Sequence, residues 1–127
     1  MVPLGELVTL AEGCTPDEVE RLVARTGFSR FPVVAPGGDL IGSLHLKDVL
    51  FATEDQRDVP LQVWRTRALA EASPDDEVEV VLRAMQRSGA HLARVWDGSA
   101  VLGVVFLEDI LEELVGEVRD AMQREAR

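Results

Sequence analysis

The chain has 127 residues, of which 46% are hydrophobic and 28% charged, and a formal net charge of −10 at pH 7. This size and balance are typical of one globular domain, or of two half-domains that share a core, and exclude a disordered chain. The negative charge argues against nucleic acid and anionic lipid as partners, because both are bound by neutralising phosphates with Lys and Arg. The single cysteine, Cys14, excludes an internal disulfide and is expected to be a buried or half-buried residue and not a nucleophile.

The first predicted elements are a helix and two strands. Residues 15–18 (Thr-Pro-Asp-Glu) predict a helix start with an N-cap and a capping box. Apolar residues then recur at helical spacing as far as Gly27, which is expected to end the helix. A strand is predicted at 31–34, and a second strand, from residue 40, leads into a short helix at 47–51.

The same order of elements recurs about sixty residues later. Residues 73–76 (Ser-Pro-Asp-Asp) predict a second helix start, and this helix is expected to be about one turn longer than the first and to end at Gly89. After a strand at 92–96 and a tighter turn, residues 101–111 align without a gap on 40–50, with four of the eleven pairs identical. A duplicated unit of this kind predicts a pseudo-twofold domain.

A long amphipathic helix is predicted from residue 107. Its apolar residues form one stripe and its carboxylates face elsewhere, which favours a solvated acidic face over a divalent-cation site. His45 and His91 have no Cys or His at metal-ligand spacing, so no metal site is predicted. Residues 119–127 are expected to continue the helix or to form a tail.

Several segments together resemble the pair of cystathionine β-synthase (CBS) domains found in the CorC/CNNM family of magnesium and cobalt transport proteins. The resemblance implies an α+β fold in which two CBS repeats, each strand-helix-strand-strand-helix, pack with pseudo-twofold symmetry. The segments that carry it are 1–3 (Met-Val-Pro), 26–33, 45–50, 91–93, 102–105 and 107–113. The implied divisions are repeat 1 at 1–54, a linker at 55–66, repeat 2 at 67–118, and a helical extension or tail at 119–127.

The resemblance also implies a role. Such a pair is a cytoplasmic regulatory module at the inner face of the membrane, attached to a transmembrane transport domain of the same polypeptide and paired as a homodimer through its CBS helices. It needs no cofactor and binds AMP or ATP, possibly with Mg²⁺, in the cleft between the repeats. Met1 falls on a methionine that is internal in the family, so the chain is expected to be a fragment, with a natural stand-alone module as the alternative.

The predicted nucleotide site depends on the two repeated aspartates. Asp48 and Asp109 can each accept both hydroxyls of a ribose, and backbone N–H groups at the same helix starts favour phosphate. Arg30 is the expected positive charge, and Phe31 and Pro32 are expected to form a wall for the base. The alternative is that the aspartates are first-turn helix acids and that Arg30 makes a surface ion pair. The predicted nucleotide-binding residues are Ser29, Arg30, Phe31, Pro32, Gly42, His45, Asp48, Val104, Phe106 and Asp109.

Two other functions are weighed against nucleotide sensing. CBS nucleotide sites typically carry Ser or Thr where this chain has His45 and Phe106, and the family normally has Thr at the second position. A degenerate pair without nucleotide, acting as a dimerisation platform, is therefore the alternative function. An enzyme is disfavoured, because the chain has no Ser-His-Asp or Cys-His order and no phosphate-binding glycine loop.

Overall fold

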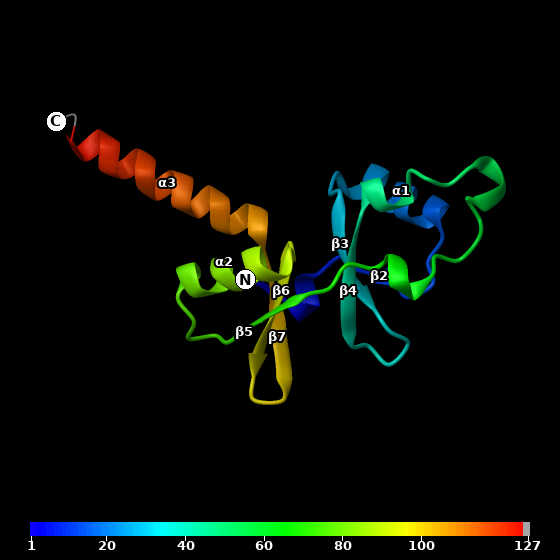
Figure 1. Cartoon of the computed structure of the whole chain (residues 1–127), viewed down its shortest axis with the longest axis horizontal. Helices are drawn as coiled ribbons and strands as arrows, with labels where there is room; N and C mark the ends of the chain where they lie inside the picture. Colours follow the sequence, from blue (N-terminus) through cyan, green and yellow to red (C-terminus); the bar gives the residue numbers. More distant parts are fainter. Residues whose placement is uncertain (126–127) are drawn as a thin grey trace. The chain divides into compact units, whose positions relative to one another are not determined.

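A computed structural model describes residues 1–125 of the chain, which divides into two compact units (Figure 1). Residues Glu6–Leu69 form one unit, which we call the first-repeat unit. Residues Met1–Gly5 join the residues from Ala70 onward in the other, the second-repeat unit. Within the described residues, none of the helices is both long enough and apolar enough to cross a membrane.

The first-repeat unit is built on a three-stranded sheet with the order β2-β3-β4. Its main elements are β2 (Leu10–Ala11), α1 (Pro16–Thr26), β3 (Arg30–Val34), β4 (Leu40–His45) and the 3₁₀ helix η2 (Leu46–Val49). Strand β3 lies parallel to β2 and antiparallel to β4. The helix-strand-strand order predicted for the first repeat is therefore confirmed.

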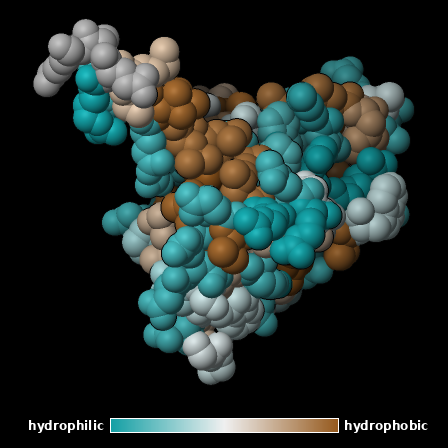
Figure 2. Space-filling view, turned by 60° about the vertical axis from the view of Figure 1, so that its left-hand side comes forward, coloured by the Kyte–Doolittle hydropathy of each residue, from teal (hydrophilic) through white to brown (hydrophobic). Residues whose placement is uncertain are grey.

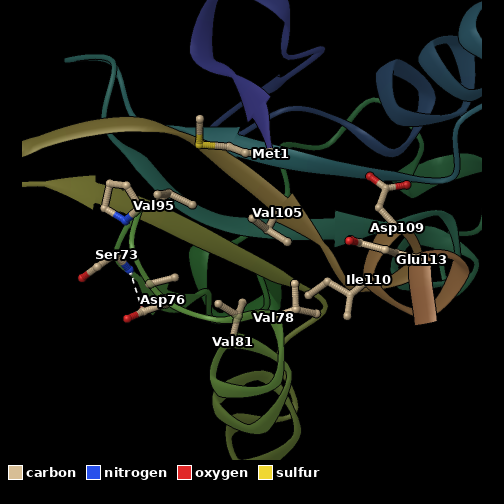
Figure 3. Close-up of a pocket in the computed structure, with 12 residues that line it drawn as sticks. Met1, Ser73, Asp76, Val78, Val81, Val95, Val105, Asp109, Ile110 and Glu113 are labelled. Atoms are coloured by element: carbon tan, nitrogen blue, oxygen red, sulfur yellow. Dashed lines mark hydrogen bonds between the residues drawn. The ribbon is translucent and has the colours of Figure 1, made fainter. Parts of the chain in front are cut away.

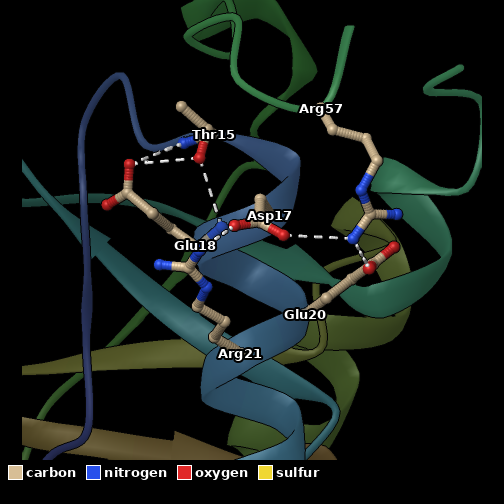
Figure 4. Close-up of polar contacts among 6 residues, drawn as sticks. All are labelled: Thr15, Asp17, Glu18, Glu20, Arg21 and Arg57. Carbon is tan, nitrogen blue, oxygen red and sulfur yellow. Dashed lines mark hydrogen bonds and ion pairs between the residues drawn. The ribbon is translucent and has the colours of Figure 1, made fainter. Parts of the chain in front are cut away.

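The start of α1 matches its sequence signal closely (Figure 4). The Glu18 backbone N–H donates to Thr15 Oγ1 at 3.2 Å, and the Thr15 N–H donates to Glu18 Oε1 at 3.3 Å. Gly27 ends the helix in the left-handed conformation, with φ of 78°. Arg57, from the loop after η2, donates to the carboxylates of Asp17 and Glu20 and so ties this loop to α1.

The core of the first-repeat unit lies between α1 and one face of its sheet. Strand side chains alternate between faces, so Phe31 and Val33 point to the same side and pack with Val19 of α1. Cys14 also belongs to this core at 5% exposure, as expected for a buried thiol, and burial raises its pKa to about 11. The other buried core members are Leu10, Leu22, Leu44, Val49 and Leu61.

The second-repeat unit has a four-stranded sheet with the order β1-β7-β6-β5. Its elements are β1 (Val2–Pro3), β5 (Ala70–Ala72), α2 (Val78–Ser88), β6 (Leu92–Asp97), β7 (Ala100–Phe106) and α3 (Leu107–Glu125). Its core packs α2 and the start of α3 against β5, β6 and β7. Helix α3 extends to Glu125, so the helical alternative describes residues 119–125, while residues 126–127 lie outside the described part.

The prediction for the second helix was wrong at its start. Helix α2 begins at Val78, with Glu77 as the N-cap residue, and not at Pro74. Residues 73–77 form a turn instead, because the Asp76 carboxylate accepts from the Ser73 N–H at 2.8 Å and the Asp76 N–H donates to the Ser73 carbonyl. Both helices therefore have 11 residues, and the extra turn expected in the second copy is absent.

The short helix expected at 47–51 is also different. The 3₁₀ helix η2 covers only Leu46–Val49, four residues. Leu50 and Phe51 follow it and are 64% and 42% exposed. Such a short helix has little dipole, so its start is not the anion site that the sequence suggested.

The repeated glycines, Gly42 and Gly103, allow a second backbone to approach each hairpin. A Cβ on Gly42 would lie 2.8 Å from the Arg67 carbonyl oxygen, and one on Gly103 would lie 2.2 Å from that of Val2. Ser43 and Arg67 exchange two backbone hydrogen bonds, while Val2 pairs with Val104. In each unit, the start of one repeat thus pairs with the hairpin of the other.

Candidate functional site

The second-repeat unit holds a pocket of about 250 Å³ around Asp109 (Figure 3). Its wall is mostly apolar, and its polar groups come from the turn before α2 and the first turns of α3. The volume lies just below the range of about 300–1,000 Å³ typical of small-molecule sites, so the pocket can enclose only a small ligand or part of a larger one. The lining residues are Met1, Ala72, Ser73, Pro74, Asp76, Val78, Val81, Val95, Val105, Asp109, Ile110 and Glu113.

Asp109 lies in the first turn of α3 and has an exposed side chain. No hydrogen bond or ion pair to its carboxylate occurs among residues 1–125. The carboxylate is therefore available to accept two hydrogen bonds from a vicinal diol. Helix α3 is anchored just before it, where the Leu107 N–H donates to the His91 carbonyl at 2.9 Å.

Asp48, the repeated partner of Asp109, is already engaged within the first-repeat unit. Arg67 donates two hydrogen bonds to its carboxylate and so forms a bidentate ion pair, with Nη2 at 2.7 Å from Oδ1 and Nε at 3.0 Å from Oδ2. The His45 backbone N–H donates to Oδ2 at 2.8 Å, and His45 Nδ1 accepts from the Lys47 N–H at 3.0 Å. This capping box makes Asp48 part of the local fold.

The electrostatics of this cluster follow from burial and charge. Burial acts to raise the pKa of Asp48, but the hydrogen bonds from Arg67 and the His45 backbone outweigh it and lower this pKa below its ordinary value. The hydrogen bond to Asp48 raises the pKa of Arg67. Burial, together with the positive charges of Arg30, Lys47 and Arg67, lowers the pKa of His45. At neutral pH the cluster is therefore an ionised pair beside a neutral imidazole.

Arg67 is the member of this cluster that the sequence did not single out. The sequence places it at the first position of the second repeat, yet it belongs to the first-repeat unit and pairs across β4. The available signal is its place in the repeat, because Arg67 stands near the start of the second repeat as Val2 stands near the start of the first. Asp109 has no arginine at the corresponding place because Val2 stands there.

Four predicted residues lie on or just before β3. Ser29 is exposed, and its carbonyl accepts from the Leu46 N–H at 2.8 Å. Arg30 is half-buried and lies opposite His45 across the sheet. Phe31 is 0% exposed within the core, and Pro32 is also fully buried, so neither presents a surface to a base in this structure.

The remaining predicted residues lie on the two repeated strands. The space where a side chain of residue 42 would lie is occupied by the Arg67 backbone, as described above. Val104 is fully buried and Phe106 half-buried. Val105, and not Phe106, lines the Asp109 pocket, because neighbouring strand residues point to opposite faces. The Phe106 ring therefore does not fill this pocket.

The charge of the Asp109 pocket limits what it accepts. Asp76, Asp109 and Glu113 are its charged lining residues, and all three are acidic. Among the described residues, no group of three or more His, Cys, Asp or Glu side chains is placed to hold a metal ion. The pocket therefore suits a neutral group with hydroxyls, such as a nucleoside, better than a bare polyphosphate.

Comparison with known proteins places this architecture in a family. The family model of the CBS domain matches residues 2–55 and 63–116. An uncharacterized protein of Mycobacterium tuberculosis (strain CDC 1551) is 39% identical over 120 residues, which are 94% of this chain and 34% of that protein. The magnesium and cobalt efflux protein CorC of Salmonella typhimurium is 34% identical over 129 residues, which cover 98% of this chain and 44% of CorC. The chain thus spans between about a third and a half of the length of these relatives.

Comparison with a solved structure also indicates a CBS-domain fold. The CBS domain of a bacterial CNNM/CorC family Mg²⁺ transporter, in complex with ATP, has a TM-score of 0.80 at 27% identity, covering 91% of this chain and 84% of that one. The α+β fold of two repeats, predicted from the duplicated segments, is therefore confirmed. The chain belongs to the CBS-domain family, as a tandem CBS pair of the CorC/CNNM type.

Proposed function

We propose that this CBS pair binds an adenine nucleotide and passes its state to a divalent-cation transport domain of the same polypeptide. In the complete protein, the module would lie in the cytoplasm at the inner face of the membrane. The observation that carries the proposal is the Asp109 carboxylate, which lines a mostly apolar pocket and has no hydrogen-bond or ion-pair partner among the described residues. The ATP complex of a related CBS domain supports this choice of ligand.

In this proposal Asp109 accepts the two hydroxyls of the ribose. A carboxylate has acceptor sites for both, and charge-assisted bonds of this kind are worth about 1.5–3 kcal/mol each. Val78, Val81 and Val105 offer the apolar surface against which a base packs.

The charge of the phosphates determines whether a nucleotide needs Mg²⁺ to bind. The lining carboxylates repel a polyphosphate, so ATP is expected to bind with Mg²⁺, whereas AMP carries less charge and depends on Mg²⁺ less. The net charge of −10 acts in the same direction over the whole surface.

A thermal-unfolding experiment tests the proposal. The purified chain is heated with and without millimolar ATP, ADP or AMP, each with and without Mg²⁺. A nucleotide at about one hundred times its Kd adds about 2.7 kcal/mol, which raises Tm by several degrees. Asp109→Asn should remove most of the shift, and Glu112→Gln, an exposed neighbour on α3 outside the pocket, should keep it. If no nucleotide raises Tm, nucleotide sensing is wrong for this chain.

The second candidate function is a dimerisation platform without nucleotide. Helix α3 exposes large apolar side chains at helical spacing, which contribute to the brown surface in Figure 2. These residues are Leu111 (46% exposed), Val115 (49%), Val118 (58%) and Met122 (63%). Contiguous apolar surface of this kind often marks a protein interface. We propose that a second copy of the chain covers it, whether or not nucleotide binds.

A further inference from the structure

The carboxylate of Asp48 is held by the chain's own arginine. Arg67 Nη2 donates to Oδ1 at 2.7 Å, and Arg67 Nε lies 3.2 Å from Oδ1 and 3.0 Å from Oδ2. The His45 N–H takes a further position on Oδ2. Each oxygen therefore already accepts two hydrogen bonds, so the acceptor sites that two ribose hydroxyls would need are taken.

The arginine is held in place by its backbone and not only by its side chain. The Ser43 N–H donates to the Arg67 carbonyl at 2.9 Å, and the Arg67 N–H donates to the Ser43 carbonyl at 2.8 Å. Gly42 makes room for this approach, since a Cβ there would meet the Arg67 carbonyl oxygen at 2.8 Å. The strand-like backbone pairing of Arg67 with Ser43 thus places the guanidinium beside Asp48.

Burial separates this pair from an ordinary surface salt bridge. The Asp48 side chain is only 13% exposed, while that of Arg67 is 46% exposed. Exposed pairs contribute little because water competes with them, but a bidentate pair on a mostly buried carboxylate is more persistent. A ligand that needs Asp48 would have to displace the guanidinium first.

The second repeat lacks this arrangement. Val2 occupies the place of Arg67, pairing with Val104 as Arg67 pairs with Ser43. An aliphatic side chain offers no donor, and Asp109 stays unpaired among the described residues. The duplicated aspartates therefore differ through one residue on each pairing segment.

We propose that Arg67 determines which repeat binds nucleotide, by occupying the first-repeat carboxylate in place of a ribose and leaving Asp109 as the competent one. This inference rests on the proposed nucleotide binding. It assigns a role to a residue that lies outside the predicted site, and it explains the inequality of the repeats by a contact within the first-repeat unit.

Binding stoichiometry and affinity for Mg-ATP and AMP, measured by calorimetry on the full chain, test this. Arg67→Met keeps the aliphatic stem and the backbone bonds to Ser43 while removing the guanidinium. Asp109→Ala should weaken binding by about a hundredfold or more, since both charge-assisted bonds to the ribose are lost. Adding Arg67→Met to Asp109→Ala should recover most of that loss, and adding Asp48→Asn as a third change should abolish the recovery.

The outcomes separate the two proposals. If the wild-type chain binds and Asp109→Ala weakens binding, but Arg67→Met restores nothing, the role of Arg67 is wrong and nucleotide sensing stands. If the wild-type chain binds nothing and Arg67→Met creates a site that needs Asp48, the role of Arg67 is supported and the Asp109 site is wrong. If neither binds, both are wrong. Arg67→Gln, which keeps a polar head without charge, serves as the second variant should Arg67→Met fail to fold, with the same expected gain.

Discussion

At the scale of single residues, the same amino acid has different roles in the two repeats. Asp48 closes a capping box and pairs with Arg67, whereas Asp109 faces a pocket without a partner among the described residues. The residue before each helix also differs, because His45 accepts a backbone N–H that a phenyl ring at Phe106 cannot accept. Identity at an aligned position therefore does not imply an identical role.

The His45 cap predicts a dependence of stability on pH. Burial and the neighbouring positive charges lower the pKa of His45 from 6.5, so the unfolded chain takes up this proton more readily than the folded one. The stability contributed by neutral His45 is present above about pH 6.5 and is lost as the pH falls through the lowered pKa of the folded state. His45→Asn keeps an acceptor for the Lys47 N–H without titrating. Urea unfolding at pH 7 and pH 5 should show a smaller loss for this variant, and equal losses would contradict the assignment.

At the scale of elements, each hairpin depends on a short segment that joins it from the start of the other repeat. Strand β1 pairs with β7, and Arg67 pairs with β4, in both cases beside a glycine. The close approach leaves no room for a side chain, so the glycine is a steric requirement of the pairing. This role explains the repeated glycine without reference to a ligand.

Gly103→Ala is expected to destabilise the fold by about 1–3 kcal/mol, because its Cβ would lie 2.2 Å from the Val2 carbonyl oxygen. Gly42→Ala, with 2.8 Å to the Arg67 oxygen, should cost less. Gly116→Ala is the matched control, because it lies in α3 with nothing within 4 Å. It should stabilise by up to about 1 kcal/mol through helix propensity. Thermal unfolding followed by circular dichroism measures all three, and a Gly103→Ala variant as stable as the wild type would contradict the steric argument.

At the scale of the whole molecule, the negative charge and the exposed apolar surface have opposite effects on self-association. The net charge of −10 opposes association, while the apolar stripe of α3 favours it. Repulsion between charges is screened by salt and apolar burial is not, so added salt should promote any assembly through α3. Under the platform function, this assembly forms without nucleotide.

Val115→Glu is expected to shift the chain toward monomer, because it places a charge at the centre of the exposed stripe, where Val115 is 49% exposed. Sedimentation equilibrium at low and moderate salt, with and without Mg-ATP, is the measurement. Glu117→Gln on the same helix is the control and should leave the assembly intact. A chain that is monomeric under all these conditions would eliminate the platform.

Much of the fold could be predicted because its signals are local. The capping box at Thr15, the helix-ending Gly27 and Gly89, and the alternation along the strands act within a few residues. The start of α2 could not be predicted, because Ser73-Pro74-Asp75-Asp76 satisfies a helix start and a closed turn equally well. In the structure the Asp76 carboxylate accepts from the Ser73 N–H, which closes the turn, and the helix begins only after it.

The candidate site was less accessible to prediction. The sequence alone determined the duplication, the family type and the two aspartates as the positions to compare. The tertiary structure decided which aspartate is free, that Phe31 belongs to the core, and that Arg67 reaches back across 19 residues to Asp48. The physical reason is the range of the interactions along the chain, since helix caps and hydrophobic periodicity depend only on residues that are close in sequence. Whether a carboxylate is occupied depends on which distant backbone lies beside it.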